Sequence, residues 1–276
     1  MAQTQNKSDY VLGTHDEELN RLGLQHRLWS EQAYALWDLA GIRAGMTVLD
    51  VGCGPGFATL DLARRVGPTG RIIAIDESQR YIDHLKEQAD AQGLRNIEAR
   101  VGDVQHIDVP AETIDAAYAR WVLCFVPDPN AVLAGVVSAL RPGGVFAIQD
   151  YFHYRGVQLG PPSAAFTRAF QAVHESWVKR GGDSDIGSRL PSMLARHGMT
   201  LPHLRSIVRI ARPTEPLWQW PDSFFKNFLP MLVDMGLLTK EELAAFNADW
   251  SAREKDPGGF FATPPVIDIV ARKPAS

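Results

Sequence analysis

Short apolar runs alternate with amphipathic stretches between Gly41 and Asp150, and this alternation is typical of a parallel sheet whose strands are joined by crossover helices. The amphipathic stretches predict helices over residues 57–66, 78–92 and 130–140. The fold class that follows is α/β, with a doubly wound sheet. The apolar runs predict five strands, at residues 47–51, 71–75, 97–101, 114–119 and 145–150.

The pattern changes after Asp150, where the alternation weakens. Two helices are expected over residues 163–180 and 186–197, and strand-like stretches at 204–211 and 266–271 complete seven strands. Residues 213–265 are too long for a hairpin and are interpreted as a helical insertion rich in aromatic residues. Ahead of the sheet, the run from Thr14 to Glu17 has the spacing of a capping box. A helical region is expected to open there and to divide at Gly23.

Length and composition fit one domain. The 276 residues, 45% of them hydrophobic and 22% charged, can bury one core and carry a modest appendage. The expected parts are an N-terminal helical cap over 1–44, a ligand-binding core over 45–211, the insertion over 212–265 and a last strand over 266–276.

Charge and cysteine content exclude several classes of protein. A net charge of −4 and the lack of any Lys and Arg run argue against nucleic acid as a partner. The two cysteines, Cys53 and Cys124, have no Cys-x-x-Cys spacing, which fits a reducing cytosol and argues against a zinc site. No segment approaches the roughly 20 apolar residues that span a bilayer. We therefore expect a cytoplasmic protein without a membrane span; its oligomeric state stays open, a homodimer included.

The strongest chemical signal is a glycine-rich turn after the first predicted strand, where the chain reads VLDVGCGPG from Val48 to Gly56. Glycine lets the backbone turn tightly and lets a cofactor lie against main-chain atoms. Twenty residues past Gly56, the second strand ends in Asp76, whose carboxylate can accept hydrogen bonds from two ribose hydroxyls. A nucleotide ligand is predicted.

The spacing of the glycines decides which nucleotide is expected. Dinucleotide enzymes use Gly-x-Gly-x-x-Gly, with a helix N-terminus aimed at a pyrophosphate. Here the third glycine is Gly56 and Phe57 stands where that pattern needs glycine. S-adenosylmethionine (SAM) has no phosphate to bind, so this spacing favours SAM and leaves a nicotinamide dehydrogenase as a weaker alternative.

Three further segments complete a resemblance: Gly102-Asp103 after the third strand, Arg120-Trp121 after the fourth, and the Leu-Arg-Pro-Gly-Gly run at 140–144. With them, the sequence resembles the class I SAM-dependent methyltransferases, and in particular the ubiquinone and menaquinone biosynthesis group, over residues 46–150. The resemblance implies a Rossmann-like seven-stranded sheet and SAM as the cofactor. It implies contacts to the methionine part by Asp50, Gly52, Cys53, Gly54 and Gly56, to the ribose by Asp76 and Glu77, to the adenine by Gly102, Asp103 and Val104, and a place beside cofactor and substrate for Arg120 and Trp121.

Methyl transfer depends mainly on positioning, and a general base is needed only if the accepting atom carries a proton. The candidate catalytic residues are Tyr151 and His153, which follow the fifth strand at its carboxyl end, and His174 on a predicted helix. His153 can equally be an exposed loop residue. No metal is predicted, because Asp150 alone does not supply a ligand cluster.

Aromatic residues suggest the acceptor. Trp220 and Phe224 of the insertion could roof an apolar substrate pocket. Trp29 of the N-terminal helix could close over the cofactor, and Trp121 follows the fourth strand, where cofactor and substrate are expected to meet. Ordinary core packing is the default interpretation for most aromatic residues of the insertion, and it explains Trp29 at least as well. The predicted function is methyl transfer from SAM to a small apolar or aromatic molecule. A SAM-binding sensor or accessory protein without turnover stays open, since a fold and a cofactor site do not establish chemistry.

Overall fold

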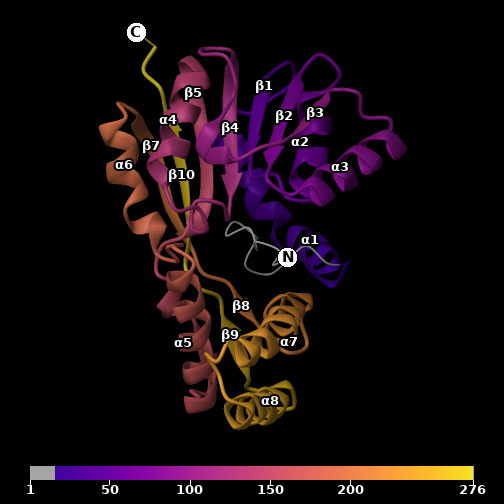
Figure 1. Ribbon diagram of the computed structural model, residues 1–276, viewed down its shortest axis with the longest axis vertical. Coiled ribbons are helices and arrows are strands. Elements are labelled where there is room, and N and C mark those ends of the chain that lie inside the picture. Colours follow the sequence, from indigo (N-terminus) through magenta and orange to yellow (C-terminus); the bar gives the residue numbers. More distant parts are fainter. Residues whose placement is uncertain (1–15, 276) are drawn as a thin grey trace, which may run out of the picture.

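A seven-stranded sheet with the order β3-β2-β1-β4-β5-β10-β7 forms one half of the molecule in this computed structural model, which describes residues 16–275 (Figure 1). The five strands β1 to β5 are parallel, and β10 is antiparallel to both neighbours, so β7 runs in the direction of the first five. The strands are β1 (Thr47–Val51), β2 (Arg71–Asp76), β3 (Ile97–Val101), β4 (Ile114–Arg120), β5 (Leu140–Tyr151), β7 (Thr200–Ile207) and β10 (Val266–Arg272).

The strand order reverses at β1, because the chain runs outward through β2 and β3 and then returns to β4 on the other side. Ligands of open α/β sheets bind at the carboxyl ends of the strands beside such a reversal. The predicted seven-stranded Rossmann-like fold is confirmed.

Both faces of the sheet are covered. Adjacent residues of β1 point to opposite sides, so that Val48 belongs to one hydrophobic core and Leu49 to the other, both fully buried. Local signals start the helices: the Ser78 side chain accepts from the Tyr81 N–H, and Asp128 caps the helix that Pro129 opens. The helices beside the sheet are α2 (Phe57–Val66), α3 (Gln79–Ala91), α4 (Pro129–Ala139) and α6 (Leu190–Arg196).

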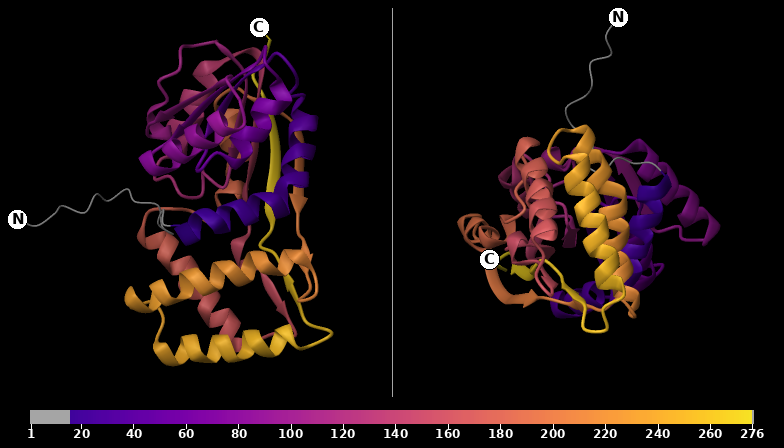
Figure 2. Two further views of the ribbon diagram at one scale, coloured as in Figure 1. Left: turned by 90° about the vertical axis from the view of Figure 1, so that its right-hand side faces the viewer. Right: turned by 90° about the horizontal axis from the view of Figure 1, so that it is seen from below.

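A long helix, α1 (Asp16–Ala40), lies between the large sheet and a second layer (Figure 2, left). The prediction that Gly23 divides this helix is wrong. Gly23 is buried inside it, and a Cβ there would come 3.0 Å from Cζ of Phe57 at the start of α2. The helix-propensity cost of glycine, about 1 kcal/mol, is offset by this close approach of two helices. The predicted capping box at Thr14 lies outside the described residues.

The second layer consists of α5 (Ala164–Lys179), α7 (Gln219–Asp234) and α8 (Lys240–Glu254), which lie below the large sheet in Figure 1. A small sheet of order β6-β9-β8 joins them, formed by β6 (Gln158–Gly160), β9 (Phe260–Ala262) and β8 (Ile210–Ala211). Short 3-10 helices are η1 (Val104–His106), η2 (Tyr154–Gly156), η3 (Ile186–Ser188) and η4 (Pro216–Trp218).

This small sheet corrects two predictions. The strand expected at 204–211 is two strands, β7 in the large sheet and β8 in the small one. The insertion expected to be helical also holds β9, which pairs with β6 and β8. The helix expected at 186–197 divides into η3 and α6, with Pro191 in the first turn of α6. Within residues 16–275, no helix is long and apolar enough to cross a membrane.

Candidate active site

The glycine-rich turn joins β1 to α2 with three residues in the left-handed region: Gly52 at φ 65°, Gly54 at φ 54° and Gly56 at φ 85°. Two of them are close-packed, because a Cβ would come 2.7 Å from Val122 at Gly52 and 2.3 Å from Leu85 at Gly56. A Cβ at Gly54 would meet no described atom within 4 Å. The outer surface of the turn is therefore open main chain, as close approach of a cofactor requires.

Asp76 lies beside this turn at the end of β2. Its Oδ2 accepts from the Gly54 N–H at 2.8 Å, and its Oδ1 accepts from the Ser78 N–H at 2.9 Å. Burial raises the pKa of the Asp76 carboxyl, although the hydrogen bonds from the two N–H groups act to lower it. A carboxylate has about four acceptor positions. The donors recorded among residues 16–275 occupy two of these positions. The neighbouring Glu77 is exposed.

Asp50 and Cys53 support the turn from inside. Asp50 is 2% exposed and accepts a hydrogen bond of 2.6 Å from the Thr59 hydroxyl. Burial raises the pKa of Asp50 to about 6. Cys53 is buried, and its N–H donates to the Ile75 carbonyl at 3.0 Å. These contacts fix the turn between β1, β2 and α2.

The end of β3 brings a third acid to the same edge. The Gly102 N–H donates to the Asp76 carbonyl at 2.9 Å, and Val104 is buried in the following turn. Asp103 caps that turn by accepting from the Gln105 N–H at 2.8 Å. Burial alone would raise the pKa of Asp103, but hydrogen bonds from Gln105 and His106 lower it. Asp103 is thus an exposed carboxylate at the edge of the sheet.

Arg120, at the end of β4, is held by α1. Its Nη2 donates to Nδ1 of His26 at 2.9 Å, and Nε2 of His26 lies 2.8 Å from Oδ2 of Asp61 on α2. Because arginine only donates, Nδ1 must accept, so the proton of His26 is on Nε2. Burial lowers the pKa of His26, which keeps the ring neutral. Nη1 of Arg120 is buried and has no hydrogen-bond partner among residues 16–275.

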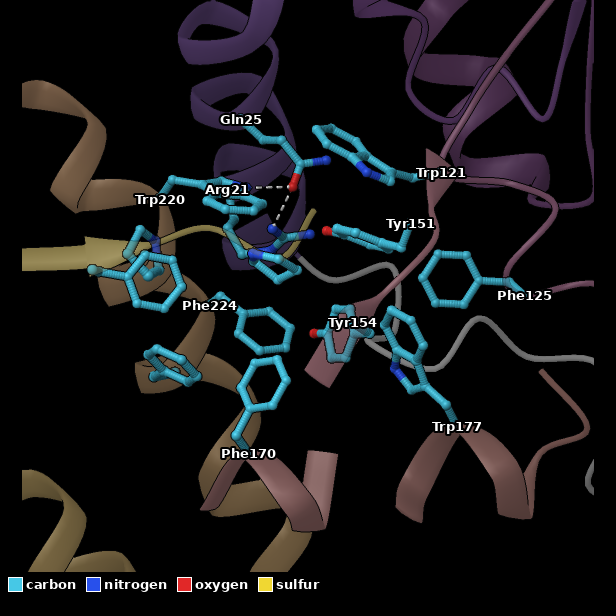
Figure 3. A pocket seen from close by; sticks show the side chains of 14 residues that line it. Arg21, Gln25, Trp121, Phe125, Tyr151, Tyr154, Phe170, Trp177, Trp220 and Phe224 are labelled. Carbon is cyan, nitrogen blue, oxygen red and sulfur yellow. Dashed lines mark hydrogen bonds between the residues drawn. The ribbon is translucent and has the colours of Figure 1, made fainter. Parts of the chain in front are cut away.

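Next to Arg120, an aromatic cavity opens between the large sheet and the second layer (Figure 3). Its empty volume is about 540 Å³, the solvent at its mouth included. Six parts of the fold contribute side chains: α1, the segment after β4, the end of β5 with η2, α5, α7, and β9 with the residues after it. The lining residues are Arg21, Gln25, Trp121, Phe125, Tyr151, Tyr154, Phe170, Trp177, Trp220, Pro221, Phe224, Phe225, Phe261 and Pro264.

Trp121 forms one wall of the cavity with an unusual backbone. Its φ of 52° lies in the left-handed region, which disfavours a tryptophan by roughly 1–2 kcal/mol. Its N–H donates to the Gln149 carbonyl at 2.9 Å, and its ring stacks on Tyr151 and Trp220, with centroids 5.8 and 6.2 Å away. Trp29 packs edge-on behind it at 5.3 Å. Packing on several sides holds the strained residue at the meeting point of turn and cavity.

A polar network closes the α1 side of the cavity. Oε1 of Gln25 accepts from Nε1 of Trp220 at 2.9 Å and from Nη1 of Arg21 at 3.0 Å. Arg21 also donates two hydrogen bonds, of 2.7 and 2.6 Å, to the buried Glu18. The indole–amide bond ties α7 to α1 (Figure 3).

The predicted catalytic and substrate-binding residues divide into two groups. Tyr151, Trp121, Trp220 and Phe224 line the cavity together. Three others do not line it. Trp29 is fully buried behind the wall, His153 is exposed, and His174 on α5 lies 2.9 Å from the Ser184 hydroxyl with its pKa lowered by burial.

Several other lining residues were not predicted from the sequence, among them Arg21, Tyr154, Phe170, Trp177 and Phe261. Phe170 and Trp177 repeat along α5 at helical spacing, which would have indicated an aromatic face. The same spacing is typical of an ordinary buried stripe, so the signal does not identify a cavity.

The strand order reverses at β1, the glycine turn is open, and an acid stands at the end of β2. Together these features are those of the class I SAM-dependent methyltransferases. The chain belongs to the methyltransferase domain family, whose model matches residues 42–181.

Named relatives extend this assignment. The chain is 34% identical to 2-phytyl-1,4-naphtoquinone methyltransferase of Nostoc punctiforme over 151 residues, 54% of this chain and 61% of that protein. The chain spans 28% to 50% of the length of the first curated relatives that it matches.

Two solved structures share the fold. Geranyl diphosphate C-methyltransferase from Streptomyces coelicolor has a TM-score of 0.58 and 19% identity, with 90% of this chain and 77% of that chain covered. The 4+2 cyclase SpnF has a TM-score of 0.60 and 18% identity, with 89% and 82% covered.

Proposed function

We propose that this protein transfers the methyl group of SAM to a small aromatic molecule bound in the cavity. The observation that carries the proposal is the adjacency of Arg120 and Trp121, since the first residue lies at the edge with the glycine turn and the second is a wall of the cavity. Two neighbouring ligands would meet at this point. Among the proteins similar to this chain, one is named for a naphthoquinone and one for geranyl diphosphate, both small molecules with large apolar parts.

The residues at the sheet edge fit SAM. The open positions on the Asp76 carboxylate would accept the ribose hydroxyls, and Asp103 with Val104 would border the adenine. The unpaired Nη1 of Arg120 would donate to the carboxylate of the methionine part, beside the open main chain at Gly54. When bound, SAM supplies a methyl group that is electrophilic because it is attached to a sulfonium.

The other contributions of the protein are to position the two reactants and to exclude water from them. Aromatic walls hold a flat molecule in one plane, and α1 covers the carboxyl edge of the sheet through its contacts to α2, β4 and α7. Holding two reactants in line replaces a bimolecular encounter with a unimolecular step. A small molecule is proposed rather than nucleic acid, because the chain has a net charge of −4.

Product formation tests the proposal. The protein is incubated with SAM and single acceptors from a panel of phenols, naphthols and aliphatic alcohols, and S-adenosylhomocysteine (SAH) and acceptor mass are followed by mass spectrometry. We expect SAH to form together with an acceptor heavier by one methylene for at least one aromatic compound, and not for the aliphatic ones. Binding of SAM without any methylated product would favour a SAM-binding protein without turnover.

A second candidate function comes from one observation: the cyclase SpnF has the same fold, so the fold alone does not require methyl transfer. A cyclase would convert its substrate in the cavity without consuming SAM. Substrate conversion at constant SAM concentration would support this candidate and contradict methyl transfer.

A further inference from the structure

A line of hydrogen bonds behind Arg120 leads away from the sheet edge with the glycine turn and ends at a carboxylate. Nη2 of Arg120 donates to Nδ1 of His26 at 2.9 Å, and Nε2 of His26 donates to Oδ2 of Asp61 at 2.8 Å. The three residues come from β4, α1 and α2, and the His26 ring between them is 8% exposed. The proposed function uses Arg120 alone and assigns no task to the other two residues.

Asp61 anchors this line because it is held from several sides. The hydroxyl of Tyr34 on α1 donates to Oδ2, and Nη1 of Arg64 donates to Oδ1 at 2.6 Å. Burial alone would raise the pKa of Asp61, but the hydrogen bonds from His26 and Tyr34 lower it, so the carboxyl is ionised at neutral pH. An ionised carboxylate only accepts, which fixes the His26 proton on Nε2 and leaves the lone pair of Nδ1 for Arg120.

The contact between His26 and Arg120 exists only while the ring is neutral. A proton on Nδ1 would face the Nη2 donor, which lies 2.9 Å from Nδ1, and would set two positive charges side by side. Burial lowers the pKa of the ring, the hydrogen bond to Asp61 raises it, and the charges of Arg120 and Arg27 lower it further, so that the net shift is downward. The charged and titratable groups around the ring are Asp61, Arg120 and Arg27 next to it, and Tyr34, Arg64, Asp50 and His84 one residue further out.

We infer that Asp61 and His26 are positioning residues: through the neutral imidazole they hold the Arg120 guanidinium so that Nη1 is left for the carboxylate of SAM, and this hold is lost when the ring takes up a proton. The inference rests on the proposed function, in which Arg120 binds the amino acid part of the cofactor. Both residues act through the guanidinium and not on the reacting atoms. Cofactor binding should therefore weaken in acid, although neither the carboxyl nor the amino group of the ligand changes charge between about pH 5 and pH 7.

Replacement of Asp61 tests the anchor. The full chain is titrated calorimetrically at pH 7.0 with SAH and with 5′-methylthioadenosine, which lacks the amino acid part. In Asp61→Asn the amide can donate to Nε2, so the His26 proton is no longer excluded from Nδ1. We expect SAH to bind about 5- to 10-fold more weakly, and 5′-methylthioadenosine to stay within about 2-fold of its affinity for the unmodified protein. Asp38→Asn is the matched control that should change neither affinity, because it breaks another ion pair between α1 and α2, that of Asp38 with Arg65.

The dependence on pH separates positioning from a merely structural role. In His26→Gln an amide oxygen can accept from Arg120 and an amide N–H can donate to Asp61, but the side chain does not titrate. At pH 7.0 this variant should bind SAH within about 3-fold of the unmodified protein. Between pH 7.0 and pH 5.0 the unmodified protein should lose about 3-fold more SAH affinity than the variant loses. Asp50, whose pKa is about 6, titrates in both proteins, so the comparison removes its effect.

His197→Gln, at the end of α6, is the matched control and should keep the pH profile of the unmodified protein. If SAH does not bind to the unmodified protein at pH 7.0, the proposed function fails. If SAH binds, the inference alone fails in either of two cases. In the first, Asp61→Asn weakens neither ligand or weakens both equally. In the second, the SAH affinity of His26→Gln falls with pH as steeply as that of the unmodified protein.

Discussion

The neighbours of Arg120 fix its guanidinium in a position where it can bind an anion. Its Nη2 is fixed by the neutral His26, its guanidinium lies 5.3 Å above the Trp121 ring, and its Nη1 is buried without a partner among residues 16–275. A fixed guanidinium binds a carboxylate without losing much side-chain entropy. At the residue scale, Arg120 is therefore the group with which we expect the protein to distinguish SAM from its analogues without a carboxylate.

Replacing Arg120 tests this role. Arg120→Gln should weaken SAH binding about 10- to 100-fold, since a charge-assisted hydrogen bond is worth about 1.5–3 kcal/mol. The affinity for 5′-methylthioadenosine, which lacks the amino acid part, should change less than 3-fold. Titration calorimetry of both ligands measures the difference, with the exposed Arg95→Gln as the control. Equal losses for the two ligands would exclude a contact to the carboxylate.

The raised pKa of Asp50 leads us to expect an unusual dependence of the unfolding free energy on pH. Because burial raises its pKa to about 6, folded Asp50 binds a proton that the unfolded chain has released above about pH 4. Its contribution to stability is therefore highest in acid and falls by about 3 kcal/mol as the pH rises through 6. Asp50→Asn removes this penalty, so the unfolding free energy of the variant relative to wild type should increase from pH 4.5 to pH 7.

Denaturation with urea at pH 4.5, 5.5 and 7 measures this difference. Asp103→Asn provides a comparison of opposite sign, because the pKa of Asp103 is lowered in the folded protein. That variant should lose stability relative to wild type as the pH rises through the ordinary range of a carboxyl group. A difference for Asp50→Asn that stays constant with pH would show that the carboxyl is ionised throughout.

At the scale of elements, α1 connects the two halves of the site. It contacts α2 and β4 through His26 and α7 through Gln25, whose Oε1 accepts from Nε1 of Trp220. The cofactor edge and the cavity therefore share one helix as their cover. An element that covers both ligands must move, or its neighbours must move, for either ligand to enter.

The bond between α1 and α7 can be removed by a substitution that keeps an aromatic side chain at position 220. Trp220→Phe should lower the unfolding free energy by about 1 kcal/mol and speed hydrogen exchange of the amides in the first half of α1. Trp250→Phe is the matched control, because its indole N–H donates to Asp222 and joins α8 to α7 instead. Exchange in α1 that rises equally in both variants would show that the effect is a general loss of stability.

The elements near the sheet centre could be predicted because their signals are local. The strands β1 and β3 and the helix α2 agree with prediction residue for residue, since each is bounded by glycine or polar residues and has one clear periodicity. The small sheet could not be predicted, because its strands have two or three residues and β6 pairs with β9 about a hundred residues away. The helix α1 continues through Gly23, which packs closely against Phe57 of α2. Helix propensity depends on neighbours in the sequence and does not reveal such a contact.

In the molecule as a whole, one part of the site has a local sequence signal and the other depends on contacts between distant segments. The glycine turn and Asp76 follow one another within 30 residues of chain, so their spacing in the sequence indicates their function. The cavity instead combines side chains from α1, β5, α5, α7 and β9, and only the fold brings Arg21 and Trp177 to one space. The aromatic lining of the cavity is therefore a property of the assembled chain.

The open glycine turn is expected to bind SAM and not a nicotinamide dinucleotide. Titration calorimetry of the purified full chain with SAH and, in a separate experiment, with NADH tests it most directly. We expect saturable binding of SAH, weakened at least 10-fold by Asp76→Ala through the loss of the ribose hydrogen bonds, and no binding of NADH. Binding of NADH without binding of SAH would show instead that the turn at Gly52 to Gly56 is that of a dehydrogenase.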